Sequence, residues 1–211
     1  MKLKKVAALC GGSKIFRLYD KVDADGVAEQ WLGDAAAAYP LRGLPYLDGP
    51  GLYRMFDVPE KTQGKLFFCQ EPWPEGVCVD DFVRGELPAE DMGVTISWGG
   101  TVLLPLRYRE GILYIQQKYL GPLEDQADYL KLFVRRTENG GRYVAAKTGM
   151  MIAGVIFPYD TVYEGFVERL DEIAALSRRE LEKRRAGAAV PRDGAQTGLF
   201  GENGEGENGE A

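Results

Sequence analysis

The chain has 211 residues, 45% of them hydrophobic and 11% aromatic, which is enough to build one packed domain followed by a tail. Its formal net charge is -6, and -4 of that charge falls on residues 186–211, so the rest of the chain is almost neutral and lacks the basic surface of a nonspecific nucleic-acid-binding protein. The chain contains no histidine, which excludes His-dependent catalytic triads and dyads and removes the commonest metal ligand.

The three cysteines, Cys10, Cys69 and Cys78, form no C-x-x-C pair. Without histidine to complete a set of four ligands, this spacing predicts no structural zinc site. Three lone thiols fit the reducing cytoplasm. The apolar run at residues 6–10 is shorter than the core of a signal peptide, which has about 7–15 residues. We therefore expect a cytoplasmic protein with no membrane association.

The first forty residues are predicted to form short antiparallel strands, because apolar residues alternate between turns rich in Gly and Asp. The expected strands cover residues 5–10, 15–22, 29–33 and 35–41. The turns between them are expected at residues 11–14, 23–26 and 33–34.

A short helix is predicted near residues 51–57. Leu52, Met55 and Phe56 follow the i, i+3, i+4 spacing of one helical face. This helix has to end before Pro59, because proline cannot continue the backbone hydrogen bonds.

A strand is predicted over residues 66–70, and a long surface loop over residues 71–93, with a short strand near residues 77–79. Within this loop, Trp73 stands between two prolines. We expect Trp73 to lie at the surface, where an aromatic ring is available for recognition.

The β-pattern becomes stronger after Gly93. Strands are expected at residues 94–98, 101–106, 111–115, 129–137 and 142–147. The last two strands flank an Asn-Gly turn, which is typical of a β-hairpin. The almost wholly apolar run at residues 149–158 predicts a central buried strand.

The last predicted element is a long C-terminal helix near residues 161–185. It is expected to begin at Asp160 or Thr161, with Thr161 and Glu164 forming a capping box. Its expected apolar stripe consists of Phe166, Leu170, Ile173 and Leu176.

These elements predict an α+β fold. The expected architecture is a mostly antiparallel, curved sheet with the short helix near 51–57, the long helix near 161–185 and a disordered acidic tail. The domain is expected to cover residues 1–185, and the Gly- and Glu-rich tail residues 186–211, because this tail has too few apolar residues to form a core.

An acidic cluster in the 71–93 loop is a candidate metal site. It consists of Asp80, Asp81, Glu86, Glu90 and Asp91. Several carboxylates suit Mg²⁺ and phosphoryl chemistry, although their spacing matches no known nuclease signature. The alternative is that the cluster is a solvated loop, and no cofactor or catalytic constellation is predicted.

A basic cluster near the end of the long helix is a candidate nucleic-acid contact. It consists of Arg178, Arg179, Lys183, Arg184 and Arg185. Basic side chains can contact phosphates. The alternative is that they lie in solvent and interact favourably with the carbonyl end of the helix dipole.

The tail contains the peptide Gln196-Thr197-Gly198-Leu199-Phe200. This peptide resembles the pentapeptide with which bacterial polymerases and repair factors bind the replication sliding clamp: Gln, an aliphatic residue, a small or acidic residue, Leu, then Phe or Leu. The resemblance implies that Leu199 and Phe200 are apolar anchors in a cleft and that the amide of Gln196 is recognised by hydrogen bonds. Thr197 departs from the aliphatic residue of the pattern.

The sequence therefore predicts a non-enzymatic binding or accessory protein of DNA replication, repair or phage biology, with the tail as its docking peptide. The partner is the sliding clamp or, as an alternative, some other protein. The block from Trp31 to Leu41 also resembles proteins of bacterial phages and mobile elements, a resemblance that implies no function. One alternative is a structural or assembly protein of such an element. Another is a metal-dependent enzyme that acts on nucleic acid through the acidic loop. Packing of Leu199 and Phe200 on the folded domain would leave the tail without a docking role.

Overall fold

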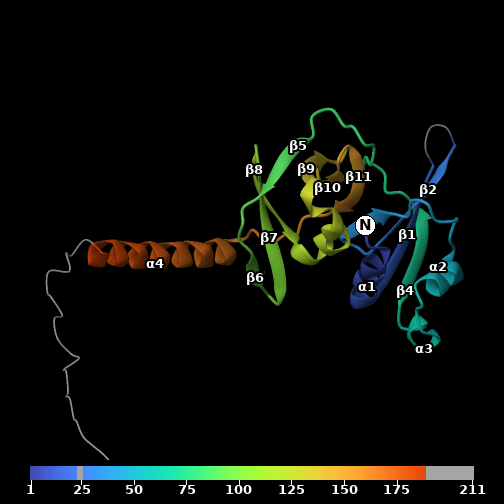
Figure 1. Cartoon of the computed structure of the whole chain (residues 1–211), viewed down its shortest axis with the longest axis horizontal. Helices are drawn as coiled ribbons and strands as arrows, with labels where there is room; N and C mark the ends of the chain where they lie inside the picture. The colour runs from blue at the N-terminus through green and yellow to red at the C-terminus, as the bar shows by residue number, and fades with distance from the viewer. Residues whose placement is uncertain (23–25, 189–211) are drawn as a thin grey trace, which may run out of the picture. The chain divides into compact units, whose positions relative to one another are not determined.

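The computed structural model describes residues 1–22 and 26–188 (Figure 1). The chain divides into two compact units, one from Met1 to Thr161 and one that begins at Val162. The first unit contains all the strands and the shorter helices, and the described part of the second contains one long helix. The predicted α+β class, with a mostly antiparallel sheet and a C-terminal helix, is confirmed.

The first element is a helix and not the strand predicted over residues 5–10. Helix α1 spans Leu3–Ser13 and buries Val6 and Cys10, which lie one turn apart on the same face. The glycines predicted to form a hairpin turn lie within its last turn, and the helix ends at Lys14, whose φ of 60° is the left-handed conformation common at helix ends.

Helix α1 is fixed at its beginning by a distant segment of the chain. The backbone N–H of Lys2 donates to the carbonyl oxygen of Pro122 at 2.8 Å, and the Lys2 ammonium group lies 2.8 Å from the Glu124 carboxylate. The N-terminal amino group lies 3.1 Å from Asp125. Such tertiary contacts can stabilise a short helix that has little stability alone.

The strands predicted over residues 15–22, 29–33, 35–41 and 66–70 are confirmed, and they form one end of the sheet. They are β1 (Ile15–Val22), β2 (Ala28–Gly33), β3 (Ala37–Pro40) and β4 (Phe67–Pro72). Their order in space is β4-β1-β2-β3, with β1 and β4 parallel and the other neighbours antiparallel. The turn predicted over residues 23–26 lies mostly outside the described residues.

The predicted short helix is confirmed as α2, which spans Gly49–Met55. The carboxylate of Asp48 accepts a hydrogen bond from the Gly51 N–H at 2.7 Å and caps the helix. Leu52 is completely buried. A further short helix, α3, covers Glu60–Gln63.

The sheet continues from β3 through β11-β10-β9-β5-β7-β6, and β8 pairs with the other edge of β7. These strands are β5 (Leu87–Asp91), β6 (Ile96–Trp98), β7 (Thr101–Tyr108), β8 (Gly111–Gln116), β9 (Leu130–Arg136), β10 (Arg142–Thr148) and β11 (Met151–Ile156). The Asn-Gly hairpin is confirmed, and Gly140 at its turn has a φ of 80°. The apolar strand is also central, since β11 pairs with β3 on one side and β10 on the other.

Two predictions for the middle of the chain are wrong. Residues 77–79 form no strand, whereas residues 87–91, placed in the loop, form strand β5 between β9 and β7. Between β8 and β9, where no element was predicted, the chain forms the 3₁₀ segment η1 (Gln117–Tyr129), which carries the partners of helix α1.

The buried side chains of the first unit form two clusters. The larger contains Phe16, Leu18 and Leu32 with residues of β7, β8 and β10. The smaller is centred on Trp31 and Tyr143. Trp73 packs against this second cluster, with its ring centre 4.9 Å from that of Trp31, and is half-buried. One side of the ring is therefore part of the core, and the predicted role in recognition stays a prediction.

The second unit contains helix α4, which spans Glu164–Ala188 and is drawn as one continuous helix in Figure 1. The helix begins later than predicted, and Thr161 forms no capping box. The Thr161 hydroxyl is buried and has no hydrogen-bond partner among the described residues. The carbonyl of Tyr163 accepts from the backbone N–H groups of Phe166 and Val167 in the first turn. In the part of the chain that the structure describes, no helix has both the length and the apolar character needed to cross a membrane.

Candidate functional site

Three charged side chains meet in the interior of the first unit. Glu86 precedes strand β5, while Arg135 lies on β9 and Lys147 on β10. The Glu86 carboxylate accepts hydrogen bonds from the Arg135 guanidinium at 2.6 and 2.9 Å and from the Lys147 ammonium at 2.7 Å. The side chains of Arg135, Lys147 and Glu86 are only 1%, 8% and 12% exposed. Charges so deeply buried require partners.

The same cluster holds the loop that follows β4. Arg135 also donates to the carbonyl oxygens of Cys78 at 3.1 Å and Asp80 at 2.9 Å. The Tyr143 hydroxyl donates to the carbonyl of Cys78 at 2.8 Å. These hydrogen bonds connect buried side chains of strands β9 and β10 to the loop backbone, so the loop is anchored at several points along its length.

The two neighbouring aspartates of the acidic cluster also have partners. The Asp81 carboxylate accepts a hydrogen bond from the backbone N–H of Ile152 at 2.7 Å, at the start of β11. The Asp80 carboxylate lies 3.3 Å from the Lys21 ammonium. Together with Glu86, these carboxylates therefore face protein donors.

The last two acidic residues lie on strand β5. Glu90 pairs with Arg107 at 2.7 Å, and both side chains are more than two-thirds exposed. Asp91 accepts a hydrogen bond from the Gly93 N–H at 2.8 Å. The structure does not bring the five carboxylates together, and among the residues it describes no group of three or more Cys, Asp or Glu side chains is arranged to hold a metal ion.

Neither Cys10 nor Cys69 is activated as a nucleophile. Burial, followed by the charge of Asp34, raises the pKa of the Cys10 thiol from 9.0 to about 12. Burial and a hydrogen bond to Glu71 raise the pKa of Cys69 as well. Because the thiolate is the reactive form, both shifts oppose nucleophilic chemistry near neutral pH.

The surface of the first unit includes a cavity of about 700 Å³ between strand β7 and segment η1. Its polar lining includes Asp91, Lys118 and Glu124. Hydrogen bonds from Lys2 and Lys5 lower the pKa of Glu124 to about 2, so this carboxylate is ionised and already paired at neutral pH. A group held in this way is poorly suited to act as a general acid.

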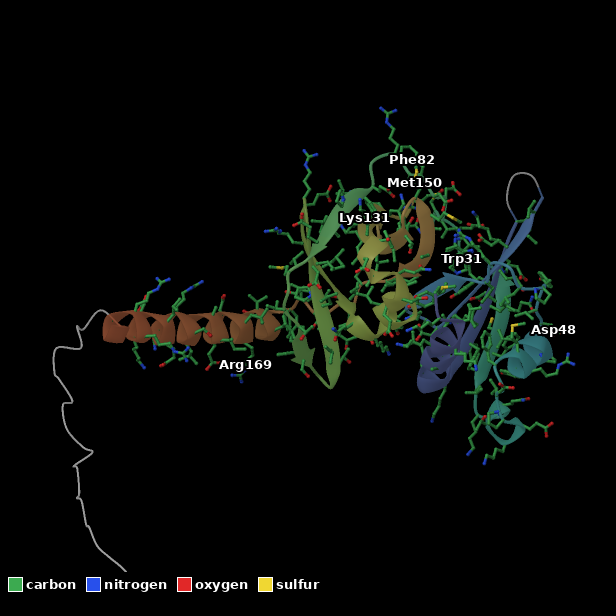
Figure 2. The ribbon with its side chains drawn as sticks, in the orientation of Figure 1. Trp31, Asp48, Phe82, Lys131, Met150 and Arg169 are labelled. Atoms are coloured by element: carbon green, nitrogen blue, oxygen red, sulfur yellow. The ribbon has the colours of Figure 1, made fainter. Side chains whose placement is uncertain are left out.

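Two large apolar side chains project from the same unit. Phe82 is 78% exposed and Met150 is 80% exposed. Both are labelled in Figure 2, where they lie by the loop before β5 and the turn before β11. Single exposed apolar side chains are common on protein surfaces and do not by themselves mark a binding site.

The predicted basic cluster lies on the C-terminal half of helix α4. Arg178, Arg179, Lys183, Arg184 and Arg185 are all exposed. Lys183 pairs with Glu180 at 2.6 Å within the helix. The structure thus places all five cations in solvent on one half of α4, but no described contact shows what they bind.

The tail peptide lies outside the described residues. Gln196, Leu199 and Phe200 follow Ala188, the last residue of α4, and Gln196 comes eight positions after it. No protein-family model matches the chain, no curated protein matches it, and no solved structure matches it.

Sequence reasoning missed Arg135 and Lys147, the cations that hold Glu86. Each follows two apolar residues within a predicted strand, Phe133-Val134 and Ala145-Ala146. A charge on an apolar strand needs a partner, but Arg135 is followed by a second arginine, Arg136, and Lys147 is the last residue of its predicted strand, so neither position stands out as a buried charge. The sequence does not indicate which carboxylate that partner is.

Proposed function

We propose that this protein is a non-enzymatic binding or accessory factor of DNA replication or repair that docks on a bacterial sliding clamp through residues 196–200. The observation that carries the proposal is the peptide Gln196-Thr197-Gly198-Leu199-Phe200, which has a glutamine, a small residue and two large apolar residues at the positions of clamp-binding peptides. Leu199 and Phe200 are the anchors, and Gln196 orients the peptide through its amide.

The position of the peptide in the chain supports the proposal. It comes after helix α4, which belongs to a separate unit from the sheet. A short peptide that follows the last described helix in the sequence is suited to dock into a cleft on another protein. The composition around it is rich in Gly, Glu and Asn, which favours an extended bound conformation over packing into a core.

The alternative of a metal-dependent enzyme finds less support in the acidic cluster. Glu86 is bound by two buried cations, and Asp81 is bound by a backbone N–H. Groups that hold the loop in place would have to break these bonds to coordinate a metal ion. The proposal therefore treats the acidic loop as part of the scaffold.

The test is a titration of the labelled full chain with a purified bacterial sliding clamp, followed by fluorescence anisotropy. We expect micromolar binding, and the double variant Leu199→Ala/Phe200→Ala should weaken it by about 30-fold or more, because two apolar anchors are lost. Asn203→Ala/Asn208→Ala, in the same tail, is the matched control and should bind like the original chain. Equal binding of both double variants would contradict the proposal.

A further inference from the structure

Helix α4 carries an apolar stripe with the spacing of a coiled coil. Val167, Leu170, Ala174 and Leu181, together with the small polar residue Ser177, are separated by alternating steps of three and four residues. Val167 is 44% and Leu181 49% exposed, although both are large apolar residues. A helix of 25 residues, about 37 Å long, with such a stripe in water is stabilised when a second helix covers it.

Charged residues along one edge of the stripe repeat every seven positions. They are Glu164, Asp171, Arg178 and Arg185, and all four are exposed. The charge of these residues changes from negative to positive at the middle of the helix, so the first half of this edge is acidic and the second half is basic.

The same asymmetry holds for the whole helix. Residues 164–176 contain four acidic and one basic side chain, whereas residues 177–188 contain five basic and two acidic side chains. A helix with this distribution is complementary to a copy of itself that runs in the opposite direction. A parallel copy in the same register would place its basic half beside the basic half of the first.

We propose that α4 pairs with α4 of a second copy of this chain in an antiparallel, two-fold symmetric coiled coil. The stripe then places Leu170 beside Leu181 of the second copy and Ala174 beside Ser177 of the second copy. At the edge, Asp171 faces Arg178 of the second copy, and Glu164 faces Arg185 of the second copy. Two-fold symmetry repeats every one of these contacts.

The apolar stripe and the charges have different roles in this pair. Burial of the leucines supplies the affinity, and the small residues Ala174 and Ser177 allow the helix backbones to approach closely at the centre. The exposed ion pairs add little affinity but select the antiparallel orientation. This inference does not rest on the clamp-binding proposal, because it uses residues of α4 alone.

The first test is sedimentation velocity of the full chain between about 1 and 100 μM, the range in which a pair of moderate affinity assembles. We expect a shift from the 23.4 kDa monomer to a dimer as the concentration rises. Leu181→Ala should raise the dimer dissociation constant at least about tenfold. A monomer at every concentration would overturn the proposal.

The matched control is Leu176→Ala. Leu176 is 53% exposed, much like Leu181, but it lies about 120° around the helix from Leu170. It is therefore outside this stripe, although it belongs to the stripe predicted from the sequence. The proposal predicts that Leu176→Ala dimerises like the original chain. If Leu176→Ala and Leu181→Ala weaken the dimer equally, the stripe is not the interface. Circular dichroism checks that both variants retain their helix.

The second test is a charge reversal. Arg178→Glu/Arg185→Glu makes the whole edge acidic, turns the attractive pairs into repulsive ones and should weaken the dimer, and the further substitutions Glu164→Arg/Asp171→Arg should restore it. Failure of the fourfold variant to dimerise while it keeps its helix content would refute the antiparallel register. A monomeric original chain that binds duplex DNA, with binding lost in the Arg178→Glu/Arg185→Glu variant, would assign the basic half to nucleic acid instead.

Discussion

Glu86→Gln is expected to destabilise the first unit strongly, because it leaves two buried cations without their counter-charge. The substitution keeps the size and shape of the side chain, but Arg135 and Lys147 remain only 1% and 8% exposed. Removing one partner of a buried ion pair costs about 3–5 kcal/mol. Arg135 retains its hydrogen bonds to two loop carbonyls, so we expect the lower end, about 3 kcal/mol.

The assay is equilibrium unfolding in urea, with Glu90→Gln as the matched control. Glu90 also pairs with an arginine, but both side chains are more than two-thirds exposed, so its loss should cost only about 0–1 kcal/mol. A cost of 3 kcal/mol should lower the urea midpoint of Glu86→Gln by about 1 M or more.

A second readout reports on the loop itself. The indole N–H of Trp73 donates to the carbonyl of Val77 at 2.6 Å, and its ring lies against Trp31. Weaker anchoring of the loop in Glu86→Gln should therefore change tryptophan emission below the unfolding midpoint. If Glu86→Gln and Glu90→Gln shift the midpoint equally, the conclusion that the buried cluster anchors the loop is wrong.

Two further predictions concern glycine and cysteine. Gly33→Ala should lower the free energy of unfolding by more than about 3 kcal/mol, measured by thermal unfolding, because the new Cβ would lie 1.8 Å from the Ala37 carbonyl oxygen. In α1, the new Cβ of Gly12→Ala would meet nothing within 4 Å. Gly12→Ala should therefore raise the free energy of unfolding by about 0.5–1 kcal/mol. If both variants change the free energy of unfolding in the same direction, the close packing of β2 against β3 is contradicted. Burial and Asp34 raise the pKa of Cys10 from 9.0 to about 12, so the folded chain retains a proton that the unfolded chain releases. Its contribution to stability is therefore complete below pH 9 and is lost as the pH rises towards 12. Between pH 8 and 11 the free energy of unfolding should fall more steeply with pH for the original chain than for Cys10→Ala. Equal slopes would contradict the raised pKa of Cys10.

Most strands were predictable because their signals are local. Residues 129–147 contain alternating β-formers around an Asn-Gly turn, and the hairpin of β9 and β10 follows directly. Helix α2 was predictable for the same reason, since an i, i+3, i+4 apolar pattern precedes Pro59.

Helix α1 could not be predicted from its own residues. A five-residue apolar run fits a strand as well as a helix, and the glycines at its end resemble a hairpin turn. The helix is selected by contacts with residues more than 100 positions away, such as Pro122 and Glu124. Strand β5 was missed because Pro88 within it argues against a strand, although its neighbours pair with both β7 and β9.

The buried cluster was also out of reach of sequence patterns. Glu86 lies 49 residues from Arg135 and 61 from Lys147, and no spacing rule connects positions that only the sheet topology brings together. The basic half of α4, by contrast, was visible in the sequence and is exposed on a helix as expected. The tail peptide depends on the sequence alone, because Gln196, Leu199 and Phe200 lie outside the described residues.

The most direct test of the central proposal is a competition experiment on the sliding clamp. A labelled synthetic peptide with the consensus clamp-binding pattern is bound to a bacterial clamp, and the unlabelled full chain is added while anisotropy is recorded. If residues 196–200 occupy the same cleft, the full chain displaces the peptide at micromolar concentration and the Leu199→Ala/Phe200→Ala variant does not. If the original chain fails to displace the peptide, or the variant displaces it equally well, the proposed docking is wrong.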